Sequence, residues 1–271
     1  MPELPEVETT RRGIEPYVVG KTVTHVIVRN PRLRWRVTKK LVRELSGQAI
    51  QSVARRGKYL LLATASGTAI LHLGMSGSLR VVPCAQPADT HDHVDIVLDN
   101  GECLRLRDPR RFGALLWTRD DPQKHKLLRD LGPEPLSPNF SGNYLFEKSR
   151  HRKRAIRDFL LDSQIVAGIG NIYANEALFT TGVRPTRAAG RINRALYNRL
   201  AEAIRETLNR ALKAGGTTLR DFRNGRGEPG YFQLSLNVYG REGEPCLVCG
   251  TAIKAKRLGQ RSAFFCPKCQ T

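Results

Sequence analysis

Short segments rich in apolar and β-branched residues follow one another between residues 22 and 117, and turn residues separate them. This spacing is typical of a β-sandwich or barrel rather than of alternating strands and helices. The expected strands cover residues 22–28, 50–53, 58–62, 69–73, 79–82, 94–98, 104–107 and 114–117. Before them, Leu4, Val7 and Ile14 predict a short helix that breaks near Pro16.

A proline-rich segment, residues 132–138, separates this region from one with a helical pattern. Neither a helix nor a strand continues through three closely spaced prolines, so the segment is predicted to be a linker. Beyond it, apolar residues recur at every fourth position from Ile192 to Leu212, which predicts a core-facing helix ended by Gly215 and Gly216. We therefore expect an N-terminal domain, a hinge, a helical domain and a C-terminal segment at residues 1–131, 132–138, 139–237 and 238–271.

The charge of the chain narrows the class of partner. Lys and Arg number 45 against 25 Asp and Glu, which gives a net charge of +20. Such a balance indicates a polyanionic partner, with nucleic acid first and an anionic membrane surface second. No apolar run approaches the roughly 18 to 20 residues of a membrane span, and the first residues are acidic where a secretory signal is basic. We expect a monomeric, cytoplasmic or nucleoid-associated protein without membrane contact.

Four of the six cysteines crowd into the last part of the chain. They form two Cys-x-x-Cys pairs, Cys246 with Cys249 and Cys266 with Cys269. Two such pairs complete a closed tetrahedral thiolate site, so the spacing predicts one structural Zn²⁺ that folds a small β-ribbon and performs no catalysis. Basic residues between the pairs, Arg261 among them, are placed to contact phosphates. The other two cysteines, Cys84 and Cys103, are expected to be packing residues.

The first residues of the chain can carry chemistry because of their position. If Met1 is removed, Pro2 becomes a free secondary amine, which attacks an aldehyde or hemiacetal carbon and forms an iminium. A free α-amino group titrates near about 8, closer to neutrality than a lysine, and Glu3 could shuttle protons beside it. The alternative is structural, because Pro2 and Pro5 would stiffen a leader and acidic residues suit a first helical turn.

Residues 164–176 place an apolar helical end against a glycine-rich turn and a second helix. The glycines of this turn, Gly168 and Gly170, would let backbone N–H groups and the Asn171 amide approach a phosphate closely. Turns with glycine are also common between helices that bind nothing, so the pattern alone leaves both interpretations open.

Six features together resemble the formamidopyrimidine-DNA glycosylase family, bacterial base-excision enzymes for oxidised purines. They are residues 2–8, 56–60, 72–77, 108–113 and 168–176 and the terminal four-cysteine ribbon, in this order. The resemblance covers essentially the whole chain. It implies an α+β multidomain fold, with an N-terminal helix and β-sandwich followed by a helix-two-turns-helix domain with a zinc ribbon.

The resemblance also implies roles for individual residues. Pro2 would be the nucleophile at the sugar C1′, and Glu3 the acid/base that assists sugar opening and later proton transfers. Lys58 would serve the phosphates and proton transfer near the lesion. Arg261 matches a position that grips phosphate and belongs with this catalytic set.

Other matched positions are expected to contact DNA. Met75, Arg110 and Phe112 resemble a wedge that fills the hole left by a flipped nucleotide, with Arg110 facing the orphaned base. A methionine, a guanidinium plane and a phenyl ring can replace the stacking lost there, whereas without the resemblance Met75 and Phe112 would be assigned to the core. His91 and Asn171 match further DNA contacts.

Two further features follow from the resemblance. Residues 217–239 would be a loop that covers the extruded base. Arg157 stands where many members of the family carry lysine, so the charge is kept but a planar fork replaces a flexible ammonium. Phosphate holding by Arg157 is expected to survive, whereas a proton-transfer or base-sensing role is in doubt.

The function expected from these features is base-excision DNA repair by a bifunctional glycosylase and abasic-site lyase. Its partner would be double-stranded DNA that contains oxidised bases or abasic sites. The enzymatic alternative is the endonuclease VIII type, which prefers oxidised pyrimidines, and Leu4 with the Met75, Arg110 and Phe112 set favours the purine branch. A non-catalytic zinc-ribbon DNA-binding protein would fit the charge and the cysteines but would leave the N-terminal motif unexplained.

Overall fold

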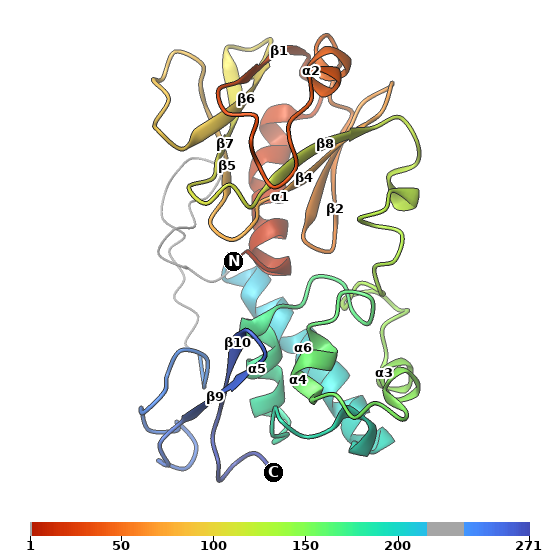
Figure 1. The fold of residues 1–271 in the computed structure, drawn as a ribbon, viewed down its shortest axis with the longest axis vertical. Helices are drawn as coiled ribbons and strands as arrows, with labels where there is room; N and C mark the ends of the chain where they lie inside the picture. The colour runs from red at the N-terminus through yellow and green to blue at the C-terminus, as the bar shows by residue number, and fades with distance from the viewer. Residues whose placement is uncertain (1, 216–235) are drawn as a thin grey trace. The chain divides into compact units, whose positions relative to one another are not determined.

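The computed structural model describes residues 2–215 and 236–271, which belong to two compact units (Figure 1). Among the described residues, unit 1 is formed by 2–129 with 214–215, and unit 2 by 130–213 together with 236–271. Most of the predicted lesion-covering loop, residues 217–239, lies outside the described residues. The zinc ribbon and the helices that precede it share unit 2.

Unit 1 contains helix α1 (Leu4–Val18), helix α2 (Lys39–Leu45) and two four-stranded antiparallel sheets. One sheet has the order β1-β6-β7-β5 and the other β2-β3-β4-β8. The strands are β1 Val23–Val28, β2 Ser52–Arg56, β3 Tyr59–Ala63, β4 Thr68–His72, β5 Ser78–Pro83, β6 Asp92–Leu98, β7 Glu102–Arg107 and β8 Ala114–Thr118. Each overlaps one of the predicted strands, and the predicted sandwich is confirmed. Helix α2 was not predicted.

One apolar core joins both sheets of unit 1 to its first helix. Alternate residues of the strands enter it, such as Leu60 of β3 and Leu106 of β7, which are almost completely buried. Val7 and Ile14 of α1 reach the same core, and α1 packs against β2, β3 and β5 (Figure 1). Because removing this much apolar surface from water is the main source of stability in a domain, the turns at the sheet edges rest on a rigid base.

The predicted break of the first helix near Pro16 is wrong, because α1 continues through Pro16 to Val18. Proline has no N–H for the carbonyl four residues earlier, which here belongs to Arg12. Both residues lie on the exposed side of the helix, so water can hydrate the carbonyl that loses its partner. The last half-turn then buries Val18 in the core.

Unit 2 contains four α-helices and a two-stranded ribbon in its described part. They are α3 Gly142–Ser149, α4 Ile156–Leu160, α5 Asn171–Thr180, α6 Arg194–Lys213, β9 Lys254–Leu258 and β10 Arg261–Phe265. The central helix, α5, packs against α4, α6 and β10. The predicted helical end at residues 164–167 is instead a turn, since α4 stops at Leu160 and a glycine with positive φ, Gly168, follows.

The predicted apolar stripe lies on α6, where Leu200, Ile204 and Leu208 are buried. Ile192 is also buried but precedes the helix. The opposite face of α6 is charged, and none of the helices in the described ranges is both long and apolar enough to cross a membrane.

The end of the ribbon returns to the turn that follows α5. The N–H of Thr271 donates to the carbonyl of Gly182, and the N–H of Arg184 donates to the carbonyl of Thr271. The Gln270 amide, which is fully buried, donates to the carbonyl of Val183 at 2.8 Å. These bonds attach the C-terminal end of the ribbon to the turn after α5.

Candidate active site and nucleic-acid interface

The start of the chain is anchored at the N-terminus of α1. Pro2 is buried and Glu3 is only 2% exposed. The carboxylate of Glu6, which is completely buried, accepts a hydrogen bond of 2.8 Å from the Glu3 N–H. Glutamate three residues after a helix cap is a known signature of such reciprocal capping. Glu6 was not singled out from the sequence, although this spacing could have identified it.

The turn that carries Lys58 is tied to the same helix. Gly57 and Lys58 form the turn between β2 and β3. Arg55 donates from Nε to Glu8 of α1 at 3.2 Å and from Nη1 to the carbonyl of Gly57 at 2.9 Å. Burial alone would raise the pKa of Glu8, but hydrogen bonds from neighbouring arginines, Arg11 first, lower it below its ordinary value. A charged Glu8 therefore fixes the Lys58 turn relative to the start of α1.

The three predicted wedge residues gather at two touching turns. Met75 and Phe112 are 40% and 45% exposed, which is unusual for large apolar side chains in this molecule. The Arg110 guanidinium lies over the Phe112 ring, 4.8 Å from its centroid. Gly74 permits this arrangement, because a Cβ there would lie 2.5 Å from the Phe112 carbonyl carbon and the φ of +68° suits glycine. Neither exposed side chain belongs to the core.

Asp108 organises the turn that presents Arg110 and Phe112. Its side chain is completely buried and accepts from the Gly113 N–H at 2.7 Å. Its own N–H donates to the carbonyl of His91 at 2.9 Å, which places His91 next to this turn. Asp108 was missed as a site residue; the aspartate before proline and glycine could have marked it as the organiser of a turn.

His72 supports the other turn. Its Nδ1 accepts from the Gly74 N–H at 2.9 Å, and its ring lies 4.8 Å from that of Tyr59. Burial first, and then the positive charges of Lys58 and Arg34, together lower the pKa of His72 to about 4. A neutral imidazole near pH 7 keeps the ring nitrogen that accepts the hydrogen bond from the Gly74 N–H.

In unit 2, the predicted phosphate-binding residue Asn171 begins α5. Its Oδ1 accepts from Nη1 of Arg157 at 3.1 Å, and its Nδ2 donates to the carbonyl of Ser262 at 2.9 Å. The Arg157 side chain is 1% exposed, whereas Arg261, at the start of β10, is exposed. The structure thus brings Asn171 and Arg157 into contact and leaves Arg261 open to solvent.

Two neighbours of Asn171 on α5 also hold the ribbon, and the sequence had not assigned them roles. Asn175 accepts from the Phe264 N–H of β10 at 2.9 Å. The buried carboxylate of Glu176 accepts from the N–H groups of three successive residues, Asn237, Val238 and Tyr239. Hydrogen bonds over more than 60 residues of sequence give no local pattern, so inspection of the motif could not reveal them.

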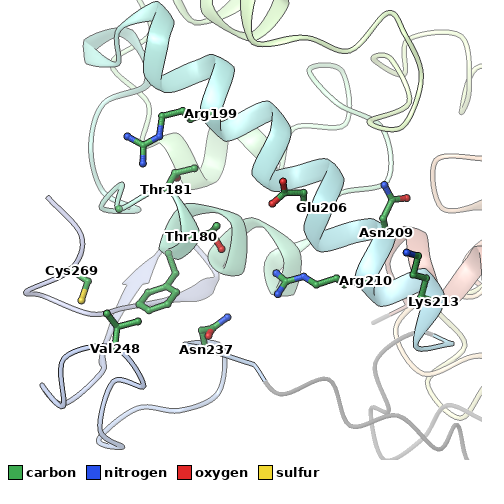
Figure 2. A pocket seen from close by; sticks show the side chains of 12 residues that line it. Thr180, Thr181, Arg199, Glu206, Asn209, Arg210, Lys213, Asn237, Val248 and Cys269 are labelled. Atoms are coloured by element: carbon green, nitrogen blue, oxygen red, sulfur yellow. The ribbon is translucent and has the colours of Figure 1, made fainter.

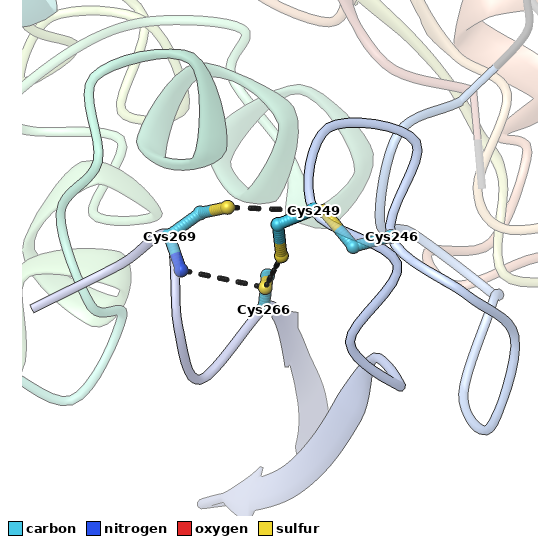
Figure 3. Close-up of side chains that lie close together, drawn as sticks. All are labelled: Cys246, Cys249, Cys266 and Cys269. Atoms are coloured by element: carbon cyan, nitrogen blue, oxygen red, sulfur yellow. Dashed lines mark hydrogen bonds between the residues drawn. The ribbon is translucent and has the colours of Figure 1, made fainter.

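The four cysteine sulfurs converge at the end of the ribbon (Figure 3). All four lie within 4.8 Å of one another, with Cys246 and Cys269 at 3.9 Å and Cys249 and Cys266 at 3.5 Å. Tetrahedral zinc with Zn–S bonds of about 2.3 Å places its sulfurs roughly 3.8 Å apart, so the donor set and spacing fit this ion. These four cysteines form the site of one structural zinc.

A cavity of about 760 Å³ in unit 2 lies away from the predicted chemistry. Figure 2 shows Arg199, Glu206, Arg210 and Lys213 of α6 along one side, with Val248 of the ribbon near the C-terminal part of α5. Among the predicted site residues only the zinc ligand Cys269 lines it. Three of its α6 residues are basic and one is acidic, so its lining is positively charged on balance, as unit 2 is as a whole.

Comparison with known sequences covers nearly the whole chain. The N-terminal and H2TH domains of formamidopyrimidine-DNA glycosylase match residues 1–115 and 131–223, and a zinc finger found in FPG and IleRS matches residues 243–271. The formamidopyrimidine-DNA glycosylase of Nitrosococcus oceani is 56% identical over 270 residues, and that of Pseudomonas aeruginosa 58%; each comparison covers 100% of both chains.

Solved structures with a similar fold belong to the same family as these sequence relatives. A mutant FPG of Lactococcus lactis in complex with Fapy-dG-containing DNA is 34% identical, with a TM-score of 0.93 over 100% of both chains. The FPG protein of Thermus thermophilus is 41% identical, with a TM-score of 0.88 over 99% of this chain and 98% of its own. The chain described here belongs to the formamidopyrimidine-DNA glycosylase family.

Proposed function

We propose that the chain is a bifunctional DNA glycosylase and abasic-site lyase that removes oxidised purines, among them 8-oxoguanine and formamidopyrimidines. The observation that carries the assignment is the anchored Pro2-Glu3 start of α1, with the Lys58 turn tied to the same helix through Arg55 and Glu8. Relatives support the substrate class, since a mutant FPG of Lactococcus lactis is seen with Fapy-dG-containing DNA and the Fpg of the same organism with DNA that contains an abasic site.

The chemistry needs the amine of Pro2 free of Met1. Its lone pair forms a bond to the sugar C1′ as the bond to the damaged base breaks; the base leaves with the glycosidic electrons and takes up the proton that the Pro2 nitrogen releases. Glu3 donates a proton to the ring oxygen as the sugar opens to an iminium. The iminium acidifies the C2′ hydrogen, and the Glu3 carboxylate takes up this proton as β elimination breaks the 3′ C–O bond. Loss of a further sugar proton then lets δ elimination break the 5′ C–O bond, and each phosphate leaves with the electrons of the bond that is broken. Water releases the sugar fragment from Pro2, and a gap bounded by phosphates remains.

Access to C1′ requires that the damaged nucleotide leave the base stack. Met75 and Phe112 project from adjacent turns with Arg110 stacked on the ring, which is an arrangement suited to fill the vacancy. Unstacking costs a few kcal/mol per step, and inserted side chains of this kind offset that cost. In this proposal Arg110 faces the base left without a partner, and Lys58 and His91 contact the strand near the lesion.

Unit 2 would hold the phosphates around the lesion. Asn171 at the N-terminus of α5 and the exposed Arg261 of the zinc ribbon are the residues proposed to do so. The net charge of +20 supplies the attraction to DNA that does not depend on sequence. We further propose that the protein acts as a monomer in the cytoplasm, associated with the nucleoid.

A single reaction tests the proposal against its alternatives. Duplex DNA with one 8-oxoguanine is incubated with the protein and borohydride, which reduces an iminium to a stable amine. We expect base release and a protein–DNA crosslink on Pro2 by peptide mapping. A crosslink on Lys58 would contradict the Pro2 mechanism, preference for an oxidised pyrimidine would favour the endonuclease VIII type, and binding without reaction would indicate a non-catalytic protein.

A further inference from the structure

Arg157 lies inside unit 2 rather than on its surface. It belongs to the short helix α4, its side chain is 1% exposed, and it ranks among the largest fully buried side chains. A guanidinium in this position cannot reach a phosphate on the protein surface. Burial lowers the pKa of Arg157 below its ordinary value. Burying a charge is costly unless hydrogen bonds compensate, so the contacts that Arg157 makes indicate what the charge is kept for.

The two Nη atoms of Arg157 point to two different parts of the proposed interface. Nη1 donates to Oδ1 of Asn171 at 3.1 Å. Nη2 donates to the carbonyls of Leu258 at 2.8 Å and Arg261 at 3.3 Å, which are the last residue of β9 and the first of β10. Nη2 also forms an ion pair of 3.0 Å with Asp158. One planar group therefore joins α4, the start of α5 and both sides of the ribbon turn.

These contacts fix the orientation of the Asn171 amide. A cation at Oδ1 determines which end of the amide is the acceptor, so Nδ2 faces the ribbon and donates to the Ser262 carbonyl at 2.9 Å. The same guanidinium holds the main chain of Arg261 while the Arg261 side chain stays exposed. Both proposed phosphate contacts thus depend on one buried fork, and a lysine would offer a single point charge to acceptors that lie in different directions.

We propose that Arg157 is a positioning residue that holds DNA indirectly, by setting the geometry of Asn171 and of the β9–β10 turn that presents Arg261. This inference rests on the DNA-binding function proposed above. It replaces the direct phosphate contact expected for Arg157 from the sequence. It also predicts that Arg157 contributes to DNA affinity only while the side chains of Asn171 and Arg261 are present.

A double-mutant cycle on the zinc-loaded protein tests this prediction. Affinity for a duplex with a non-cleavable abasic-site analogue is measured for Arg157→Met in the wild-type background and in the Asn171→Ala/Arg261→Ala background. We expect a loss of about tenfold in the first, the size typical of a lost phosphate or base contact. In the second we expect a change within about twofold, the usual error of additivity. The same factor in both backgrounds would overturn the inference, because a direct contact is lost whatever its neighbours.

Salt dependence and a matched variant complete the test. Arg154→Met removes a basic side chain from the same segment, but Arg154 is 50% exposed and pairs with Asp162. Arg154→Met should therefore reduce DNA affinity by the same factor in both backgrounds. Arg157→Met should make the salt dependence of affinity shallower only where Arg261 is present, since about 0.9 counterion is released per phosphate contact. A shallower dependence in the Arg261→Ala background would also overturn the inference.

Two controls keep the result interpretable. Zinc content and thermal unfolding show whether Arg157→Met is folded; if it is not, the same cycle is run with Arg157→Lys, which keeps the charge and should lose an intermediate amount of affinity. Base release and borohydride trapping by the wild type are measured on the corresponding cleavable duplex. If the wild type neither releases the base nor is trapped by borohydride, the proposed function is rejected. If the wild type is active but Arg157→Met reduces affinity by the same factor in both backgrounds, only the role of Arg157 is rejected.

Discussion

The two units hold their proposed DNA-contacting residues in opposite ways. In unit 1 the wedge side chains are exposed, and close backbone packing beneath them fixes their position, as at Gly74 against Phe112. In unit 2 the residues beneath the proposed DNA-contacting side chains are buried and polar, and hydrogen bonds of Arg157 and Glu176 with distant parts of the chain fix the surface. The difference follows from core size, because two packed sheets can support turns by shape, whereas a small ribbon needs a metal and buried polar bonds.

The largest effect should come from blocking the Pro2 amine with a retained Met1 or an added residue. This change should abolish base release and strand cleavage, because the proposed iminium forms on this amine. Binding should be unchanged, since unit 2 and the basic surface are untouched. Gel-based cleavage and affinity measurements on one 8-oxoguanine duplex would check both. As a comparison, Glu3→Gln should lose base excision by about 10²- to 10⁴-fold yet keep much of the lyase activity at a preformed abasic site.

Cys249→Ser or zinc chelation should produce the reverse pattern. DNA affinity should be lost, because zinc contributes on the order of 10 kcal/mol to folding of such ribbons and little else replaces it. Unit 1 should stay folded, and both tryptophans of the chain, Trp35 and Trp117, lie there to report it by fluorescence. If the metal-free protein bound DNA with full affinity, the zinc ribbon of unit 2 would not be needed to hold DNA, and the proposed separation of DNA binding from chemistry would be wrong.

Acid should weaken unit 1 through His72. Its pKa is about 4 in the folded protein and 6.5 in the unfolded chain, so the unfolded chain binds more protons between these values. The stability linked to His72 is complete above pH 6.5 and falls as the pH decreases towards 4, by roughly 3 kcal/mol in total. Urea unfolding followed by tryptophan fluorescence at pH 7 and pH 5 would measure part of this loss.

His72→Asn keeps a hydrogen-bond acceptor but cannot titrate in this range, so its stability should change less between pH 7 and pH 5 than that of the wild type. The exposed His25 of β1 provides the control, and His25→Asn should leave the wild-type pH dependence in place. An equally steep dependence for His72→Asn would show that other groups cause it.

The smallest predicted effect compares two glycines with similar backbone angles. Gly74→Ala would combine strain at φ +68° with a contact of 2.5 Å to the backbone at Phe112, whereas Gly101→Ala would meet only the strain at φ +82°. We expect about 1 kcal/mol of destabilisation for Gly101→Ala and more for Gly74→Ala. Only Gly74→Ala should slow 8-oxoguanine excision more than cleavage at an abasic site. Equal behaviour of the two variants would show that the turn contact does not position the wedge.

The sequence was informative where a pattern is local. Short apolar, β-branched segments between turn residues located the strands of unit 1, the fourfold stripe located α6, and the cysteine spacing located the metal site, because each depends on residues close in the chain. Helix α2, at Lys39–Leu45, escaped because seven residues with four charges show little periodicity. The role of Arg157 escaped for a different reason, since the two ribbon carbonyls that it holds lie more than 100 residues away and its charge suggested exposure.

The contacts of Arg157 also have a consequence for the order in which the protein can mature during synthesis. Leu258 leaves the ribosome 101 residues after Arg157, so α4 and α5 are made long before the carbonyls that Arg157 will hold. Every strand of unit 1 has been synthesised before Leu258 is, so its two sheets can fold before the ribbon exists. During this interval the guanidinium has no ribbon to bind. A nascent chain of this family would therefore acquire its catalytic terminus first and its grip on DNA last.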